Sequence, residues 1–598
     1  MILQSLVNYY QMLINQNDSH IPKLGYSEEN VHFCLMLDED GNLKSVRDLR
    51  DNSDNKKSSK LVPIKLTLPE RVQKSSGIRS NCFWENAEYA LGVEKKKDKG
   101  KVDKKVMTQK RFQFFCNLHE SILKNTSDAG ATALLLFLDK HKKNNCQNEL
   151  IAKIEDDLNN GELLVFRLEG DSQYLHERPA IKKVWENYYS QKEGNVKGIS
   201  LISGKEGSIS ENHATISGVK DAQSAGARIV SFNAKAFESY GHEKGYISPI
   251  TEEEMFQYTT VLNYLLSRKG QRIQIADATT VFWSETNNVD QTNAIYALLT
   301  GGDIENELAE SEEKKENEHD TMLIHSFLKG IQKGNPIDWD HTNIDRNTEF
   351  YILGLSPNNA RISIRYFYKK SFGDTVQNIA RHYKDTELYS KNNYAPLIPW
   401  RMLSETAVND KVHPLLGGTL LKTLLNGTRY PNMFYQQILL RIRAEQSINH
   451  YKAASIKGYL VRKARFENNI VRERLITVSL NEDREDFAYL FGRLFAVLES
   501  TQLAANPGIE RTLRTTYFSR ASSTPKVVFS TLLRLNQYHQ DKLAKEMKGL
   551  QVNHDKLITQ ILEKIATVPP QLNLEEQGDF MLGYYQQKQE LYRKGDRE

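Results

Sequence analysis

Hydrophobic and polar positions along the chain follow two periods, and the period changes from segment to segment. Leu3, Leu6, Val7 and Tyr10 recur at intervals of three and four residues, which predicts an amphipathic helix at the start of the chain. Helical spacing also dominates 110–190 and the chain beyond about residue 375. These long periodic stretches predict that helices make up most of the C-terminal half.

Strands are predicted where short apolar runs are bounded by turn residues. The stretch 196–290 has this texture, because Gly and Ser break it into short β-rich segments. The clearest predicted strands lie at 31–38, 43–49, 163–168, 228–232, 279–283, 351–355 and 361–368. The predicted fold class is therefore α+β and multidomain, with a mixed α/β N-terminal region, then helical segments and a C-terminal four-helix bundle.

The length of 598 residues predicts several domains, because a single core stops growing near ~250–300 residues. We predict three parts, at 1–345, 346–474 and 475–598. An acidic linker or loop lies within the first, where 303–320 holds nine acids and two lysines. The last part should fold alone, because it contains four amphipathic helices, at 485–503, 524–549, 553–567 and 577–593.

Cysteine usage and hydropathy predict a cytoplasmic protein. The four cysteines, Cys34, Cys82, Cys116 and Cys146, form no CxxC pair, which argues against a zinc site or a disulfide framework. The longest strongly apolar run, Ala133 to Leu138, is far shorter than the ~18–20 residues of a membrane span. The first residues lack the basic start of a signal peptide. We therefore expect no membrane association.

The formal net charge is only +4, so any nucleic-acid surface must come from local clusters of cations. The segment 429–465 is the most asymmetric, with eight Lys or Arg and one acid. A solvated surface loop is the alternative for the lysine-rich runs. The candidate contacts to the nucleic-acid backbone are Lys56, Lys57, Lys60, Lys95, Lys96, Lys97, Arg441, Arg443, Arg462, Lys463, Arg511, Arg514 and Arg520.

Sequence motifs for catalysis are not found. The chain has no GxxxxGK[ST] phosphate loop and no GxGxxG after a strand, which argues against an ATPase or a dinucleotide enzyme. His319–Asp320 and His554–Asp555 are interpreted as solvent-exposed coincidences, because a metal nuclease needs further converging ligands. We expect no enzyme activity, no cofactor and no metal.

Two polar loops are candidates for contacting base edges. The turn 75–84 carries Arg79 and Asn81, and 231–241 carries Asn233 and Lys235. Asn and Arg are the side chains that pair bidentately with adenine and guanine, and Lys suits phosphate. The alternative for 223–241 is a tight packing corner.

Many segments together resemble one known family, the large subunit of the type I-C CRISPR surveillance complex. They occur in the family's order over nearly the whole chain. They are 1–10 (MILQSLVNYY), 76–81 (SGIRSN), 86–92 (NAEYALG), 222–233 (AQSAGARIVSFN), 236–241 (AFESYG), 277–283 (DATTVFW), 353–361 (LGLSPNNAR), 427–431 (GTRYP), 490–499 (LFGRLFAVLE), 521–525 (ASSTP) and 583–585 (GYY).

This chain departs from the family pattern near residues 199–214. The family often has a Cys shortly before the Gly204 region and a His-Pro near position 213. Here 199–203 contains no Cys, and His213 is followed by Ala214. A metal or thiol role in this region is therefore not expected.

The resemblance implies a non-enzymatic subunit that recognises a protospacer-adjacent motif in double-stranded DNA. Such subunits help to open the duplex, stabilise the displaced strand and recruit a separate helicase–nuclease. The implied partners are the guide RNA-bearing backbone subunits and the subunit at the crRNA end. In this interpretation 1–345 recognises DNA, 346–474 supplies the basic region, and 475–598 resembles a small subunit.

A separately translated copy of the C-terminal bundle is a further expected partner. No Met lies between Met433 and Met547, so such a product would start at a non-Met codon, with Val471 and Val478 as candidates. Two other classes of function stay open. The chain could be a stand-alone DNA-binding or repair protein, or an unrecognised metal-dependent nuclease.

Overall fold

The structure is a computed structural model in which the chain forms two compact units. One contains Met1–Ala214 and Ser231–Val261, and the other contains Thr215–Val230 and Leu262–Glu598. Side chains are not described at 102–103, 289–294 and 594–595. The structure describes all residues except 17–20, 53–60, 73, 75–76, 95–101, 145, 159–160, 192–195, 225, 233, 286–288, 302–328, 333–338, 340–344, 393, 410 and 596–598.

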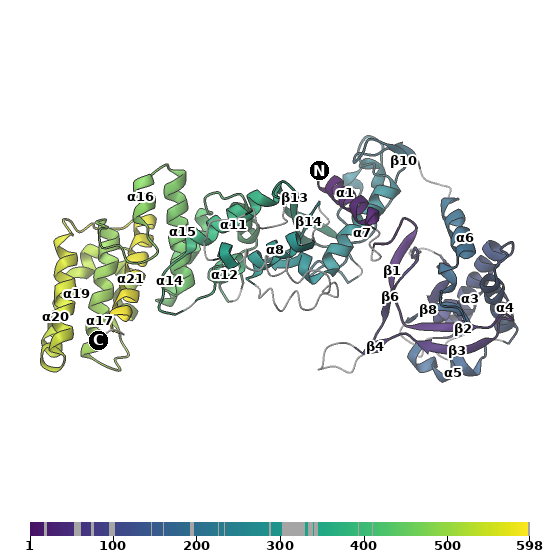
Figure 1. Ribbon diagram of the computed structural model, residues 1–598, viewed down its shortest axis with the longest axis horizontal. Coiled ribbons are helices and arrows are strands. Elements are labelled where there is room, and N and C mark those ends of the chain that lie inside the picture. Colours follow the sequence, from purple (N-terminus) through teal and green to yellow (C-terminus); the bar gives the residue numbers. More distant parts are fainter. Residues whose placement is uncertain are drawn as a thin grey trace. The chain divides into compact units, whose positions relative to one another are not determined.

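A four-stranded sheet of order β3-β2-β8-β7 organises the first unit (Figure 1). Strands β2 and β8 are parallel, and the two outer strands are antiparallel to their neighbours. Successive residues of a strand face opposite sides of a sheet. Phe33 and Leu35 of β2 accordingly join the core beneath the helices, whereas Cys34 joins a second cluster with Trp84 on the other face.

The elements of the first unit are, in chain order, α1 (Ile2–Asn15), β1 (Tyr26–Val31), β2 (Phe33–Leu37), β3 (Leu43–Asp48), β4 (Asp51–Asn52), β5 (Leu61–Val62), β6 (Ile64–Pro69), β7 (Trp84–Asn86), α2 (Ala87–Ala90), α3 (Val102–Leu123), α4 (Ala129–Lys143), α5 (Glu149–Lys153), η2 (Glu155–Leu158), β8 (Leu163–Leu168), η3 (Leu175–Glu177), α6 (Pro179–Ser190), β9 (Lys197–Ile199), β10 (Glu206–Ser208), η4 (Lys235–Phe237), η5 (Lys244–Ile247) and α7 (Glu252–Ser267), whose last turns enter the second unit.

An antiparallel sheet of order β11-β12-β13-β14 begins the second unit, and helices complete it. One continuous hydrophobic core joins this sheet to the C-terminal helices, from Ile275 to Tyr585. The elements are η6 (Lys269–Gln271), β11 (Arg272–Ile275), β12 (Ala278–Ser284), α8 (Val289–Thr300), β13 (Glu349–Asn358), β14 (Arg361–Ser371), α11 (Phe372–Thr386), α12 (Pro399–Ser404), α13 (Pro414–Leu425), α14 (Asn432–Glu445), α15 (His450–Phe466), α16 (Ile470–Leu475), α17 (Phe487–Ala505), α18 (Leu513–Ala521), α19 (Pro525–Glu546), α20 (Lys548–Glu563) and α21 (Leu574–Gly595).

The structure confirms the predicted α+β, multidomain fold class. The predicted strand 163–168 is β8, and the opening helix is α1. The four helices predicted after residue 475 are α17, α19, α20 and α21, and the short α18 lies between the first two. Helical spacing predicted these elements well because each buries one face in the core.

Two predictions between 196 and 290 are wrong. The predicted strand 228–232 is irregular, with isolated bridges from Ala227 and Arg228 only. The 16-residue helix α7 was missed. Its start carries a capping signature that could have revealed it, because the hydroxyl of Thr251 accepts the N–H of Glu254, three residues later.

The division of the chain differs from the predicted parts. The predicted boundary at 345/346 passes through a sheet, because β12 pairs with β13. The boundary at 474/475 passes through the common core, and α21 contacts both α17 and α15. Tyr435 Oη of α14, for example, donates to the carbonyl of Leu574 over 2.9 Å. A 475–598 fragment would lack these partners.

Two glycines allow α17 and α21 to pack backbone to backbone. A Cβ at Gly492 would overlap the carbonyl oxygen of Phe580, and a Cβ at Gly583 would overlap that of Tyr489. Any larger residue would therefore separate the two helices. Within the described residues, no helix is long and apolar enough to cross a bilayer.

Candidate nucleic-acid interface

The turn before β7 has a strained backbone that is held by buried polar groups. Phe83 is fully buried and has a φ of 67°, a left-handed conformation that is unusual for a bulky residue. Its N–H donates to Nε2 of His119 on α3 over 2.8 Å. The other ring nitrogen of His119 is 2.7 Å from the Phe115 carbonyl, so Nδ1 carries the proton. Burial lowers the pKa of His119 to about 4, which keeps this acceptor neutral.

The structure corrects the prediction that Asn81 contacts bases. The Asn81 side chain is 1% exposed, and its Oδ1 accepts the N–H of Val72 over 2.8 Å. Asn81 therefore closes the loop between Val72 and the turn. Arg79, which lies within this loop, is exposed. Its role as a motif reader stays a prediction.

Cations beside this loop are held by carboxylates and aromatic rings. Lys74 pairs with the buried Glu85, and its Nζ lies 3.9 Å from the centroid of the Tyr89 ring. Burial, the largest effect, lowers the pKa of Lys74, although Glu85 opposes this shift. Arg71 pairs with Glu29 and lies over the Trp84 ring. These contacts fix the ends of the loop that carries Arg79.

A second exposed loop lies between η4 and η5. Lys235 is exposed on η4, whereas Asn233 lies outside the described residues. Tyr240 and Gly241 form the tip of a tight turn closed by a bridge between Ser239 and His242. Both tip residues have positive φ, 53° and 75°. Tyr240 is 98% exposed, so packing against the described residues does not compensate for its strained conformation.

The basic segment 429–465 does not form the open cationic face that its sequence predicts. Arg462 is 0% exposed, and its Nε donates to Asp385 over 2.9 Å. The prediction that Arg462 contacts nucleic acid is therefore wrong, because a buried guanidinium cannot reach phosphate. Arg441 pairs with Glu445, and Lys463 pairs with Glu575.

Among the four candidate contacts in this segment, Arg443 is the one that makes no ion pair with a described residue. Its guanidinium is half-buried, and both Nε and one terminal nitrogen lack a hydrogen-bond partner among the described residues. Burial lowers the pKa of Arg443. Of the four candidate contacts in this segment, Arg443 therefore has the most guanidinium nitrogens without a hydrogen-bond acceptor.

In the C-terminal helices the predicted cations differ in accessibility. Arg511 and Arg520 are exposed, whereas Arg514 lies 3.6 Å from the buried carboxylate of Glu499. Lys56, Lys57, Lys60, Lys95, Lys96 and Lys97 lie outside the described residues.

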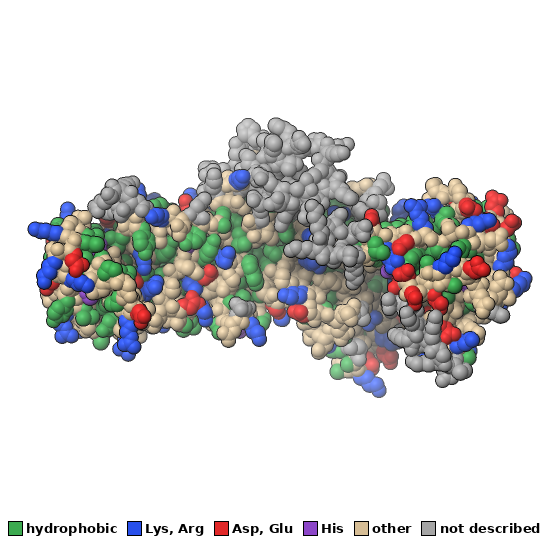
Figure 2. Space-filling view, turned by 90° about the horizontal axis from the view of Figure 1, so that it is seen from below, with side chains coloured by type: hydrophobic (Ala, Val, Ile, Leu, Met, Phe, Trp, Pro, Cys, Tyr) green, Lys and Arg blue, Asp and Glu red, His purple; other side chains and the backbone are tan. Residues whose placement is uncertain are grey.

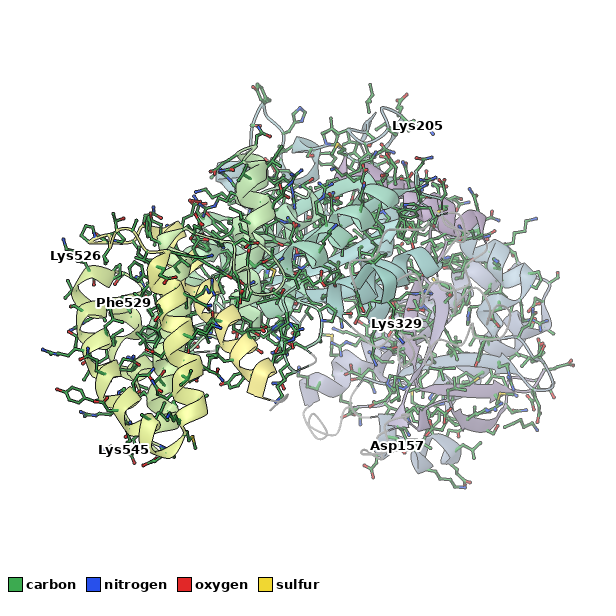
Figure 3. The ribbon with its side chains drawn as sticks, turned by 60° about the vertical axis from the view of Figure 1, so that its left-hand side comes forward. Asp157, Lys205, Lys329, Lys526, Phe529 and Lys545 are labelled. Atoms are coloured by element: carbon green, nitrogen blue, oxygen red, sulfur yellow. The ribbon has the colours of Figure 1, made fainter. Side chains whose placement is uncertain are left out.

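Sequence reasoning missed an exposed stripe on α19. Arg534, Tyr538 and Lys542 are all exposed and are four residues apart, so they lie on one helix face at steps of about 6 Å. Lys526 and Lys545 lie near the two ends of the same helix (Figure 3). On the face shown in Figure 2, Lys and Arg side chains occur over these C-terminal helices. The spacing of four residues between each cation and the Tyr could have revealed this stripe in the sequence. Alternating cations and aromatic rings suit a single strand.

We expect the two cations and the tyrosine of the α19 stripe to contribute separately to the binding of single-stranded DNA. Arg534→Ala with Lys542→Ala should reduce the slope of log K against log salt for single-stranded DNA by about 1.4, at ~0.7 per phosphate. Tyr538→Ala should weaken binding by ~1–3 kcal/mol without changing the slope, because stacking releases no counterions. Salt-dependent fluorescence anisotropy measures both. Gln537→Ala on the adjacent face is the control, and an equal loss in that variant would refute the stripe.

Among the residues that the structure describes, no three His, Cys, Asp or Glu side chains could share a metal ion. His554, interpreted from sequence as exposed, is buried and hydrogen-bonds the hydroxyl of Thr501 over 3.0 Å. His319 and Asp320 lie outside the described residues.

Comparison with known families identifies the chain as a CRISPR-associated protein. The family model described as CRISPR-associated protein (Cas_Csd1) matches residues 6–592, nearly the whole chain. The chain belongs to this family, which is that of the large subunit of the type I-C CRISPR surveillance complex. No curated protein matches the chain. Membership in this family implies that the protein works in a CRISPR-associated complex.

Proposed function

We propose that this subunit recognises a protospacer-adjacent motif in double-stranded DNA, assists duplex opening and stabilises the displaced strand. Family membership over residues 6–592 supports a role in a CRISPR-associated complex. The observation that supports recognition is the strained turn at Phe83, which is locked by His119 and adjoins the loop with the exposed Arg79. Strained backbone held by buried partners is a feature of binding and switch sites.

A recognition site of one or two side chains is sufficient for this subunit. In a guide-RNA complex base pairing reads most of the target, so the protein needs to read only a few base pairs. One or two side chains are sufficient for this. The partners in the proposal are the guide RNA-bearing backbone subunits, the subunit at the crRNA end, target DNA and a helicase–nuclease. A separately translated copy of the C-terminal helices is a further proposed partner.

The test of motif recognition uses the reconstituted complex with its guide RNA. Duplex targets carry randomised bases beside one protospacer, and the bound fraction is sequenced. We expect a short motif to be enriched, because bidentate contacts to bases give ~1–3 kcal/mol of discrimination. Bound DNA without any enriched flanking motif would refute recognition by this complex. A complex lacking this chain is the control.

We also propose that the chain is not a nuclease and that the cut is made by the recruited helicase–nuclease. Purified chain incubated with labelled DNA, Mg²⁺ or Mn²⁺ and ATP should leave the DNA intact. Adding the helicase–nuclease to the complete complex should produce cleavage. Cleavage that co-purifies with the isolated chain through successive columns would overturn this proposal.

Tyr240 is the residue we propose for holding the opened duplex. A fully exposed ring at a turn tip can stack on a base at the fork, and such stacking is worth ~1–3 kcal/mol. Tyr240→Asn should keep the turn, because Asn tolerates positive φ, yet slow strand opening about tenfold. Base exposure followed by 2-aminopurine fluorescence measures this rate, and Tyr240→Phe is the control that retains the ring. Opening at the wild-type rate in the Asn variant would exclude this role.

A further inference from the structure

A cavity of about 660 Å³ lies in the second unit where α14, α15 and the start of α21 meet. None of the sequence predictions for base contacts involved it. Its lining residues are Asn432, Tyr435, Gln436, Tyr459, Lys463, Gln571, Leu572, Asn573, Leu574, Glu575 and Gln577. Five of these carry side-chain amides.

Two tyrosine rings form a fixed aromatic wall. The rings of Tyr435 and Tyr459 are stacked, with centroids 3.9 Å apart and planes 9° apart. The hydroxyl of Tyr459 donates to Oδ1 of Asn432 over 2.8 Å, and the hydroxyl of Tyr435 donates to the Leu574 carbonyl over 2.9 Å. Both rings are therefore held in place before any ligand arrives.

The amides around this wall have unused hydrogen-bonding capacity. Gln577 is 5% exposed; its Nε2 donates to the Leu572 carbonyl, which leaves Oε1 buried without a partner. Gln436 and Gln571 are exposed, and their side chains hydrogen-bond to no other described residue, whereas Asn432 uses only its oxygen. A carboxamide offers both donors and an acceptor. An unsatisfied buried acceptor is costly, and a ligand N–H would relieve that cost.

The charge balance of the cavity disfavours phosphate as the ligand. Lys463, its one cation, pairs with Glu575 and lies 3.6 Å from Glu467. The first turn of α21 carries two carboxylates, Glu575 and Glu576. Glu576 accepts the N–H of Asn573 over 2.7 Å. An uncharged, flat ligand with hydrogen-bonding edges fits this lining better than an anion does.

We propose that this pocket binds the base of one unpaired nucleotide in a DNA strand, with adenine preferred. The inference extends the proposed function, because duplex opening would supply the unpaired strand. A carboxamide donates to N7 and accepts from N6 of adenine, which gives a bidentate pair. Tyr435 and Tyr459, which are almost fully buried, line one side of the pocket, and the sugar and phosphates remain outside.

The experiment measures binding of the full-length chain to oligothymidylates that carry adenine, thymine or an abasic site at one central position. We expect the adenine strand to bind about tenfold more tightly than the abasic strand. Gln436→Leu with Gln571→Leu should remove this difference and leave the salt slope unchanged, because neither residue is charged. Gln537→Leu on α19, outside the pocket, should retain it. An excess of free dAMP should not displace the adenine strand.

The outcomes distinguish this pocket from the proposed function. Equal binding of the adenine and abasic strands would overturn the pocket proposal, and so would equal losses in the pocket and control variants. Displacement by free dAMP would overturn binding within a strand and assign the pocket to a free nucleotide. Recognition of the flanking motif is measured on duplexes, so its failure would leave the single-strand result unaffected.

Discussion

Replacing Asp385 by alanine will destabilise the second unit by about 3–5 kcal/mol, the cost of leaving a buried charge without its partner. Asp385 is buried and accepts the Nε of Arg462 over 2.9 Å and two nitrogens of Arg465 over 3.0 Å and 2.7 Å. The Arg462 guanidinium also lies 4.3 Å from the centroid of the Tyr430 ring. Without the carboxylate it stays buried and uncompensated.

Urea unfolding of the full-length chain, followed by circular dichroism and by proteolysis of the second unit, measures this loss. Asp385→Asn should cost less than Asp385→Ala, because the amide oxygen still accepts hydrogen bonds. Asp541→Ala, an exposed position on α19, is the matched control. A decrease of less than about 1 kcal/mol in the free energy of unfolding of the alanine variant would mean that water hydrates the Arg462 guanidinium in the folded chain.

Replacing Arg79 by alanine will reduce discrimination between targets with and without the motif by a factor of about 5 to 150. This range corresponds to ~1–3 kcal/mol for a bidentate contact to a base. Arg79 is exposed on the loop that Asn81 closes, so its loss should not disturb the buried turn. Competition binding by the reconstituted complex, with paired duplexes that differ only in the motif, measures the ratio.

Two further variants make the Arg79 result specific. Arg520→Ala, at an exposed candidate contact to the nucleic-acid backbone, should weaken both duplexes alike, because a phosphate contact carries no sequence information. Asn81→Ala should also reduce discrimination, but together with stability, because the Val72 N–H would lose its acceptor. If Arg79→Ala discriminates as well as the wild type, the loop is a packing element and motif reading lies elsewhere.

The buried position of Arg462 shows the limit of reading charge along a sequence. Eight cations and one acid in 429–465 predicted an open basic face. Asp385, which neutralises Arg462, lies 77 residues away in the chain, and Glu575, which pairs with Lys463, is still more distant. Counting charges within a segment cannot register such partners. The α19 stripe could have been found, because its i, i+4 spacing is local.

The α+β fold class, the strand 163–168, the main C-terminal helices and the family could all be predicted from the amino-acid sequence. These depend on local periodicity and on motifs spread along the chain. Three features could not be predicted in this way: Asn81 is buried, β12 pairs with β13, and residues between 432 and 577 line one pocket. The physical reason is that burial and hydrogen-bond partners depend on contacts between distant segments, whereas periodicity reports only which face of each element turns inward.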